Sequence, residues 1–131
     1  MTEQRPRSEK FERGLKARRK VMGDAYVDRT LANASDFGWP MQVMATEMAW
    51  DGIWNRPGLD HRSRSLLNLG MIAALNKPQE MRNHIRGAIN NGVTKSELQE
   101  VCLQIAVYCG MPTGLDTVRL VEEVLKDMGL D

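Results

Sequence analysis

The sequence lacks the features that most directly indicate a partner or a compartment. Its 131 residues carry a formal charge of only +1, so nothing predicts a broad attraction to nucleic acid or anionic lipid. The longest apolar stretches, such as 66–75, are much shorter than the roughly 20 residues that a membrane span needs. Residues 1–10 are polar and contain no apolar segment of the secretory kind. We therefore expect a cytoplasmic protein with no membrane and no nucleic-acid partner.

The sequence is also poor in the residues of common catalytic and metal sites. Cys102 and Cys109 are the only cysteines, and seven helical residues separate them by roughly 10 Å, which is too far for a disulfide. We expect two reduced thiols. A glycine-rich phosphate loop, a Cys-x-x-Cys pair and a Gly-x-Ser-x-Gly elbow are absent, and the two histidines lack metal-ligand spacing. No metal or other cofactor is therefore expected.

What the sequence does contain is helical periodicity, interrupted by only five prolines and without a convincing period-two stretch for a strand. Its length suits one domain. Turn and capping signals predict six or seven helices. They are expected to begin at Ser8, at Asp24 as a second cap, near Trp39, at Asp60, near Pro78, at Thr94 and at Pro112, and the third is expected to run from Trp39 to Trp54.

The third expected helix carries more apolar bulk than a small bundle can bury. Its large apolar side chains are Met41, Met44, Met48, Trp50 and Trp54. Exposed apolar area of this kind usually marks an interface. We therefore expect the chain to assemble with further copies of itself.

Two titratable residues, Glu80 and His84, lie four positions apart in the fifth expected helix and so share one helix face. A carboxylate beside an imidazole raises the imidazole pKa and fixes the orientation of the ring. This spacing is compatible with an acid catalyst and equally with a surface ion pair, so both interpretations stay open.

Arg62 and Arg64 fall in the first turn of the fourth expected helix, where cations oppose the helix dipole by some tenths of a kcal/mol. Local conflicts of this kind are tolerated most readily where function requires them. An anionic ligand, or an acidic neighbour such as Glu47 or Asp60, would resolve the conflict. A solvated arginine pair is the alternative.

Several ordered motifs resemble the carboxymuconolactone decarboxylase superfamily. They are Leu59-Asp-His-Arg-Ser-Arg-Ser-Leu-Leu67, the small-residue helix that follows, His84-Ile-Arg-Gly-Ala-Ile-Asn-Asn-Gly-Val-Thr94 and Glu97-x-x-Glu100-Val101. Further motifs are similar to the 4-carboxymuconolactone decarboxylase subgroup: Arg13-Gly-Leu, Gly23-Asp-Ala-Tyr-Val-Asp28, Glu47-x-x-Trp50, Trp54-x-Arg-Pro-Gly-Leu59 and Tyr108-Cys-Gly110. The likeness covers about residues 10–127.

The resemblance implies a six- to seven-helix orthogonal bundle of the alkylhydroperoxidase-like type. It implies a single domain over 1–131, with 1–9 as a flexible tail, assembled as a trimer or hexamer. The activity that it implies is cofactor-free decarboxylation of 4-carboxymuconolactone to 3-oxoadipate enol-lactone and CO₂, a step of protocatechuate catabolism in the β-ketoadipate pathway.

The same superfamily contains thiol enzymes that use Cys-x-x-Cys-x-x-x-His with an upstream glutamate. Here His84 matches the motif histidine, but Lys77 and Glu80 stand where the cysteines would be, and Ser65 stands at the glutamate position. A thiol peroxidase needs a low-pKa attacking thiol and a resolving partner. A thiol-dependent peroxidase or disulfide-exchange protein using Cys102 or Cys109 is thus an alternative, and a non-catalytic helical oligomer that binds small acids is another.

The decarboxylase hypothesis assigns roles to the residues already singled out. His84 is the acid that protonates the ring carbon, or a donor to the developing oxyanion, and Glu80 holds its orientation. Glu47 completes the expected catalytic set. An arginine, Arg62 or Arg64, binds the carboxylate arm bidentately.

Aromatic residues complete the expected substrate-binding set. Trp50 and Trp54 lie on the face of the third helix that carries Glu47, at i+3 and i+7 from it, and Tyr108 comes from the subgroup motif. The alternative for the two tryptophans is a packed core or an interface.

Overall fold

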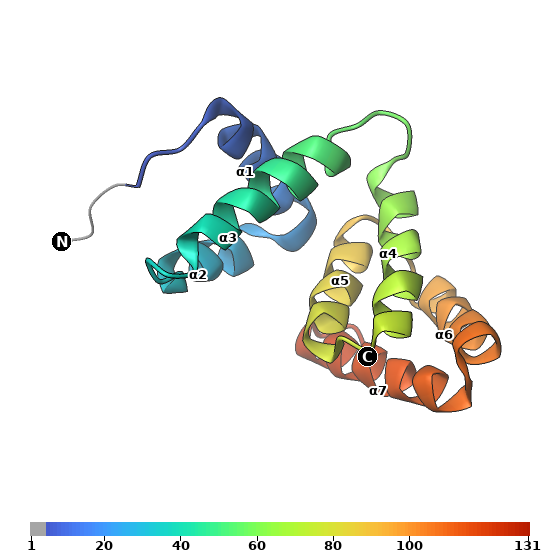
Figure 1. Ribbon diagram of the computed structural model, residues 1–131. Coiled ribbons are helices and arrows are strands. Elements are labelled where there is room, and N and C mark those ends of the chain that lie inside the picture. The colour runs from blue at the N-terminus through green and yellow to red at the C-terminus, as the bar shows by residue number, and fades with distance from the viewer. Residues whose placement is uncertain (1–4) are drawn as a thin grey trace. The chain divides into compact units, whose positions relative to one another are not determined.

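The computed structural model describes residues 5–131, and this part of the chain is helical with no strand (Figure 1). The expected all-α class is confirmed. Residues 1–4 of the expected tail lie outside the described residues. In chain order the elements are α1 (Glu9–Met22), α2 (Asp24–Asn33), α3 (Trp39–Met44), the π-helix η1 (Ala45–Trp54), α4 (His61–Leu75), α5 (Pro78–Asn90), α6 (Lys95–Cys109) and α7 (Met111–Asp127).

Three predicted helix caps are confirmed. The Ser8 hydroxyl accepts a hydrogen bond from Phe11 N, and the Asp60 carboxylate accepts one from Ser63 N at 2.7 Å. Thr94 and Glu97 form a complete capping box at the start of α6. Because each cap pairs a backbone N–H that the helix itself leaves without a partner, these residues set where α1, α4 and α6 begin.

The expected cap at Asp24 is wrong, because Asp24 is the first residue of α2 and Gly23 is the cap. Gly23 has a φ of +89°, a conformation that side chains rarely adopt, and it ends α1 and precedes α2 with no residue between. Asp24 therefore stands in the first turn, where its carboxylate faces the positive end of the α2 dipole. It also pairs with Arg19 at 3.2 Å.

The third expected helix changes type partway along. It is α-helical from Trp39 to Met44 and π-helical from Ala45 to Trp54. A π-helix pairs residues five apart instead of four, so its turns are wider and residues three and seven apart do not share a face. The expected common face of Glu47, Trp50 and Trp54 is therefore wrong. Trp50 and Trp54, which are four apart, stack with ring centroids 4.9 Å apart.

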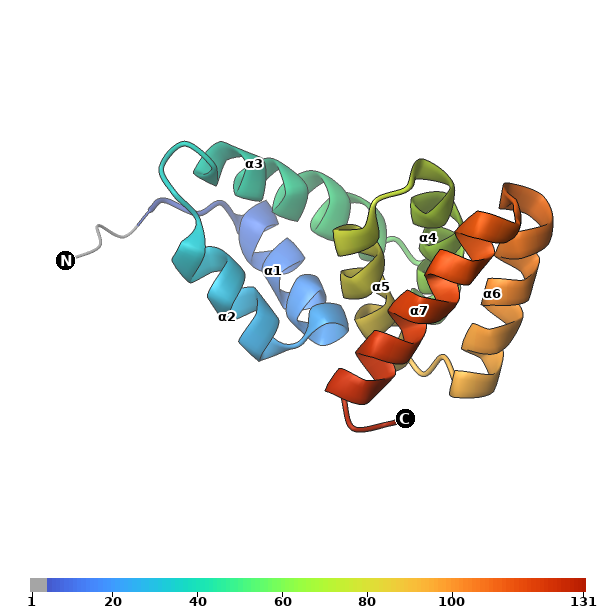
Figure 2. The same cartoon turned by 90° about the horizontal axis from the view of Figure 1, so that it is seen from below.

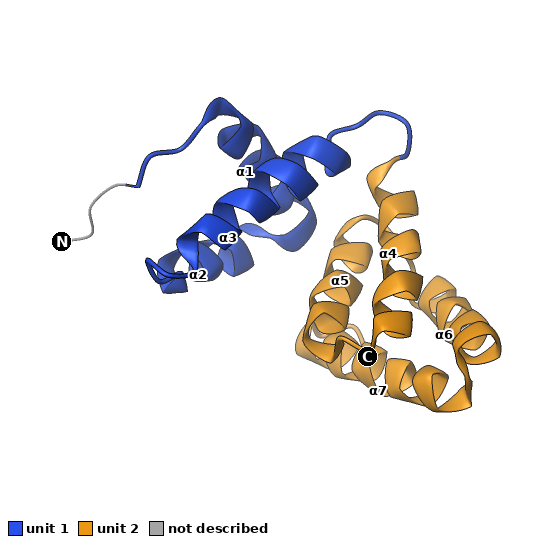
Figure 3. Cartoon of the chain, in the orientation of Figure 1, with its two compact units in different colours: residues 1–59 blue, residues 60–131 orange. Residues whose placement is uncertain are grey.

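The chain divides into two compact units, residues 1–59 and 60–131 (Figure 3). In the first unit α1 packs along η1 and against α2 (Figures 1 and 2). Gly14 lies at the closest approach, where an added Cβ would be 3.0 Å from Asp51 N and would overlap the Thr46 carbonyl oxygen. The core of this unit consists of Phe11, Leu15, Ala17, Val21, Met22, Val27, Trp50 and Trp54.

In the second unit α4 packs against α5 and α6 against α7, and α5 and α7 are also in contact. Figure 2 shows α6 and α7 lying side by side. Gly114 permits this close packing, because an added Cβ there would lie 2.8 Å from the Ala106 Cα. The core consists of Leu69, Ala73, Met81, Ile85, Ala88, Val93, Leu98, Cys102, Ile105, Val121, Val124 and Leu125. Among residues 5–131, no helix combines the length and apolar character that a bilayer crossing requires.

Candidate functional site

The imidazole of His84 lies on α5 in a partly buried position, one turn after the exposed Glu80. Burial lowers the pKa of His84 below its ordinary value, and the negative charge of Glu80 opposes this effect without overcoming it. Glu80 therefore acts to raise the pKa of His84, as expected. The pKa is nevertheless lowered overall, so the expectation of a raised pKa is wrong. At neutral pH the His84 ring is neutral, with one N–H donor and one acceptor nitrogen.

Two acidic residues, Asp60 and Glu97, lie close to the first turn of α4. Arg62 forms an ion pair with Glu97 of α6, and the pKa of the Asp60 carboxyl is lowered by its hydrogen bonds with Ser63 and further by the charges of Arg62 and His61. These contacts resolve the conflict between the Arg62 cation and the helix dipole. The sequence predicts Asp60 or Glu47 as the acidic neighbour, whereas Glu97 enters the sequence analysis only as part of the family motif Glu97-x-x-Glu100-Val101.

A second link joins α4 to the end of α5. The Asn91 amide donates to the Ser65 hydroxyl at 2.9 Å and to the His61 carbonyl oxygen at 3.3 Å. Ser65 is completely buried, so this bond satisfies a polar group inside the unit. The sequence carried no signal for this contact, because 26 residues separate the two side chains.

The first unit holds Glu47 on η1. Its carboxylate oxygen Oε2 accepts a hydrogen bond of 2.7 Å from the Ser8 hydroxyl. Trp50 and Trp54 are 7% and 5% exposed and belong to the core of this unit. This is the packed-core arrangement that their sequence positions had left open, and their part in substrate binding stays a prediction.

Tyr108 lies near the end of α6 with 82% of its surface exposed. Other exposed apolar residues stand on the same helix and at the start of α7, among them Leu103, Val107, Met111 and Leu115. The helix α4 has a similar exposed set in Leu67, Met71 and Leu75. Apolar side chains gathered on a surface in this way are typical of an interface with another protein or subunit.

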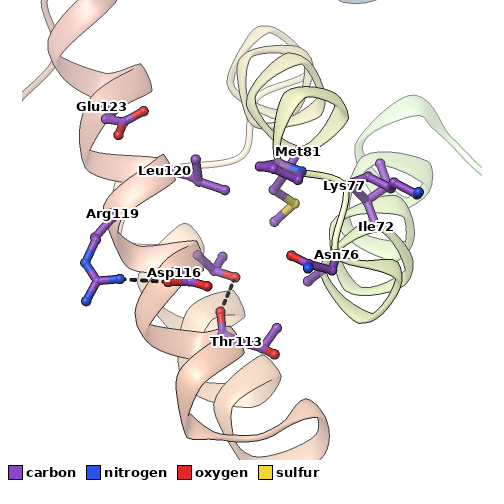
Figure 4. A pocket seen from close by; sticks show the side chains of 12 residues that line it. Ile72, Asn76, Lys77, Met81, Thr113, Asp116, Arg119, Leu120 and Glu123 are labelled. Carbon is purple, nitrogen blue, oxygen red and sulfur yellow. Dashed lines mark hydrogen bonds and ion pairs between the residues drawn. The ribbon is translucent and has the colours of Figure 1, made fainter.

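The second unit contains hollows between its helices. One of about 200 Å³ lies between the α4–α5 turn and α7 (Figure 4), where Asn76 and Met81 point into the space and Arg119 is bonded to Asp116 at 2.7 Å. A hollow of about 620 Å³ lies between α6 and α7 and includes Cys102, and one of about 500 Å³ between α4 and α6 includes Glu97. His84 is not among the residues that line these three.

Both cysteines are free thiols, as their spacing predicted. Cys102 is buried in the core of the second unit, and burial raises the pKa of its thiol, which suppresses the nucleophilic thiolate. Cys109 is exposed at the end of α6. Within residues 5–131, no cluster of three or more His, Cys, Asp or Glu side chains is arranged to hold a metal ion.

The chain is similar in sequence to a protein family and to several known proteins. The sequence model of the Carboxymuconolactone decarboxylase family matches residues 40–123. A nitrosuccinic acid decarboxylase of Metarhizium robertsii is 45% identical over 118 residues, which are 90% of this chain and 82% of that protein. A 4-carboxymuconolactone decarboxylase of Acinetobacter baylyi is 38% identical over 122 residues, which are 93% of this chain and 91% of that protein.

Proposed function

Because this chain belongs to the carboxymuconolactone decarboxylase family, we propose that it is a carboxy-lyase that converts 4-carboxymuconolactone into 3-oxoadipate enol-lactone and CO₂. The observation that carries this proposal is the 38% identity to the Acinetobacter baylyi 4-carboxymuconolactone decarboxylase over nearly the full length of both chains. The reaction is a step of protocatechuate catabolism in the β-ketoadipate pathway, and we place it in the cytoplasm.

The chemistry of this substrate needs no cofactor as an electron sink. The departing carboxylate is attached to a saturated ring carbon next to a double bond, and this double bond is conjugated with the lactone carbonyl. When the carbon–carbon bond breaks, its electron pair passes into the ring and forms a furan-like oxyanion, and a proton is then added to a ring carbon. The protein must stabilise that oxyanion, bind the retained acetate arm and deliver the proton.

His84 suits the first and the last of these tasks. Its neutral ring can donate an N–H to the developing oxyanion without the cost of burying a cation. A bound anionic substrate raises the imidazole pKa, as any nearby negative charge does, and Glu80 acts in the same direction. The ring can then take up a proton and transfer it to the substrate carbon.

An arginine of α4 binds the retained carboxylate arm, with two parallel hydrogen bonds. For Arg62 this binding replaces its ion pair with Glu97, whereas Arg64 lies half a turn further along the helix. Glu47 remains a proposed member of the catalytic set. The family match runs from residue 40 through 123 and so includes parts of both units, which supports the prediction of one carboxymuconolactone decarboxylase-like domain over 1–131.

The active form is a homo-oligomer, a trimer or hexamer as the family resemblance implies. The exposed apolar residues of α4, α6 and α7 support this proposal, because an isolated subunit would leave Val107 at 78% and Leu75 at 68% exposure. Tyr108 lies within that surface, so contact between subunits would bury Tyr108 together with its apolar neighbours.

A second candidate substrate is nitrosuccinic acid, because the Metarhizium robertsii relative named for it is 45% identical over 90% of this chain. The two reactions have related requirements. In nitrosuccinic acid the departing carboxylate is on the carbon that bears the nitro group, which accepts the electron pair as the conjugated carbonyl does. A donor such as His84 can stabilise the anion that forms in either reaction. What distinguishes the two substrates is therefore their shape and the position of their charges.

The test is a direct comparison of both substrates with purified protein, following CO₂ release and identifying each product by mass. We expect turnover of 4-carboxymuconolactone to exceed that of nitrosuccinic acid. The His84→Ala variant should lose about 10²-fold in kcat if His84 transfers the proton. The matched control is His61→Ala, which removes the only other histidine and should keep its activity within about threefold of the wild type.

The opposite preference would transfer the assignment to nitrosuccinic acid. Release of CO₂ at the spontaneous rate from both substrates, by protein shown to be folded and oligomeric, would refute the decarboxylase proposal. Binding of the lactone without turnover would then favour the non-catalytic alternative.

A further inference from the structure

Ser8 makes two hydrogen bonds with the same hydroxyl group. Its oxygen accepts from Phe11 N at 3.0 Å, which caps α1, and its O–H donates to Glu47 Oε2 at 2.7 Å. The two partners lie on different elements, since Phe11 is in α1 and Glu47 is 39 residues away in η1. The start of α1 and one carboxylate of the expected catalytic set are thus joined through a single side chain.

The two bonds strengthen each other. A hydroxyl that accepts from a backbone amide is polarised and becomes a better donor, and a bond to an ionised carboxylate is stronger than one between neutral groups. The carboxylate also lies beside the start of α1, where the dipole of the helix favours negative charge. Within residues 5–131 the other oxygen of Glu47, Oε1, makes no hydrogen bond or ion pair, so it remains available to a ligand.

The backbone at Glu47 is held in place by contacts of the preceding residue. The preceding residue, Thr46, is completely buried, and its hydroxyl accepts from Arg18 of α1 at 3.4 Å. Its carbonyl oxygen lies directly against Gly14 of α1. Glu47 therefore has a fixed backbone position, and the hydrogen bond from Ser8 selects one orientation of the carboxylate from those that this position allows.

We infer that Ser8 is a positioning residue for Glu47: it holds Oε2 so that Oε1 is presented to the substrate. This inference rests on the proposed decarboxylase function, in which Glu47 belongs to the catalytic set. It also gives Ser8, which falls within the expected tail 1–9, a defined part in the site. Ser8 acts through Glu47 and does not itself meet the substrate.

The two roles of Ser8 can be separated by substitution. Ser8→Asp keeps an oxygen that can cap α1 but has no proton to donate when it is ionised, and it sets two carboxylates against each other. Ser8→Thr keeps both the cap and the donor. Ser35→Ala is the matched control, because Ser35 is another serine of the first unit, with a hydroxyl that accepts from Gly38 N at 3.0 Å.

We expect Ser8→Asp to lower kcat about tenfold while KM changes less than about threefold, because a misdirected carboxylate impairs the reaction step more than binding. Ser8→Thr should restore kcat to within about twofold of the wild type, and Ser35→Ala should match the wild type. Wild-type kinetics in a folded Ser8→Asp variant would overturn the inference. Equal losses in Ser8→Asp and Ser8→Thr would also overturn it.

A stability measurement decides the Ser8–Glu47 bond without any turnover assay. Ser8→Asp should lower the unfolding midpoint, and adding Glu47→Gln should recover it, because the glutamine amide can donate to the new aspartate. The double variant should nevertheless stay impaired in kcat. If the wild type turns over neither substrate, the proposed function fails, and this midpoint recovery alone decides the bond. Lack of recovery would show that Ser8 does not hold Glu47.

Discussion

Replacing Gly14 with alanine is predicted to destabilise the first unit by forcing α1 away from the π-helix. The added Cβ would overlap the Thr46 carbonyl oxygen and lie 3.0 Å from Asp51 N. Thr46 and Asp51 are five residues apart, which is the spacing of a π-helical hydrogen bond. Both obstructing atoms belong to the backbone, so no side-chain rotation can make room, and the helices must separate or the π-turn must deform.

The expected cost can be worked out from two opposing effects. Overpacking a well-filled contact costs about 1–3 kcal/mol, and more where backbone must move. Alanine in place of glycine within a helix contributes about 1 kcal/mol in the other direction. Because the overlap here is severe, we expect a net loss of about 2 kcal/mol. For a domain of this size that corresponds to a lower unfolding midpoint by roughly 8 °C.

Gly70→Ala is the control, because Gly70 lies in α4 and a Cβ there would meet no atom within 4 Å beyond its chain neighbours and the backbone of its own helix. This variant should gain about 0.5–1 kcal/mol from helix propensity alone. Tryptophan fluorescence in urea is the assay for Gly14→Ala, since all three tryptophans, Trp39, Trp50 and Trp54, belong to the first unit. Gly70→Ala lies in the second unit, so its unfolding in urea is followed by the circular dichroism of the helices. An unchanged or raised midpoint in Gly14→Ala would refute the reasoning, because it would mean that α1 and η1 are not in close contact at this position.

Three further predictions concern the second unit. The lowered pKa of His84 means that the unfolded chain binds a proton more readily, so stability is present above about pH 6.5 and is lost as the pH falls through the folded pKa. His84→Gln should make the free energy of unfolding, measured in urea between about pH 7.5 and 5, less dependent on pH than in the wild type. An equal dependence on pH in the two proteins would contradict this prediction. Thr94→Ala should cost about 1 kcal/mol by breaking the capping box, with Thr94→Ser nearly neutral in the same assay. Iodoacetamide should alkylate the exposed Cys109 well before the buried Cys102, and decarboxylation should survive, as peptide mass mapping with a parallel assay can test; loss of activity on alkylation of either thiol would favour the thiol-dependent alternative.

Much of the fold could be predicted from local signals. The caps at Ser8, Asp60 and Thr94 act within three residues of the helix start, and prolines and glycines act on their own backbone. Such signals are written in consecutive residues, so they can be read without knowing what the helix packs against. The failure at Asp24 arose at a junction with no intervening residue, where the same signals allow two starting points.

The site was less predictable, because its contacts join residues that are distant in sequence. The pairing of Arg62 with Glu97, and of Ser8 with Glu47, depends on how helices pack and leaves no periodic pattern. The direction of the His84 pKa shift was also beyond the sequence. The spacing revealed the charge of Glu80, but the burial that outweighs it is a property of the packed unit.

The sequence by itself determined that the chain is helical, where most helices begin and end, and which family motifs it carries, because these depend on local backbone preferences and on residue identity. Only the tertiary structure decided that residues 45–54 form a π-helix, that Trp50 and Trp54 stack in a core, and which carboxylates meet Arg62 and Ser8. The physical reason is that helix register, burial and ion pairing depend on close packing between segments 30 or more residues apart, and local preferences do not encode that packing.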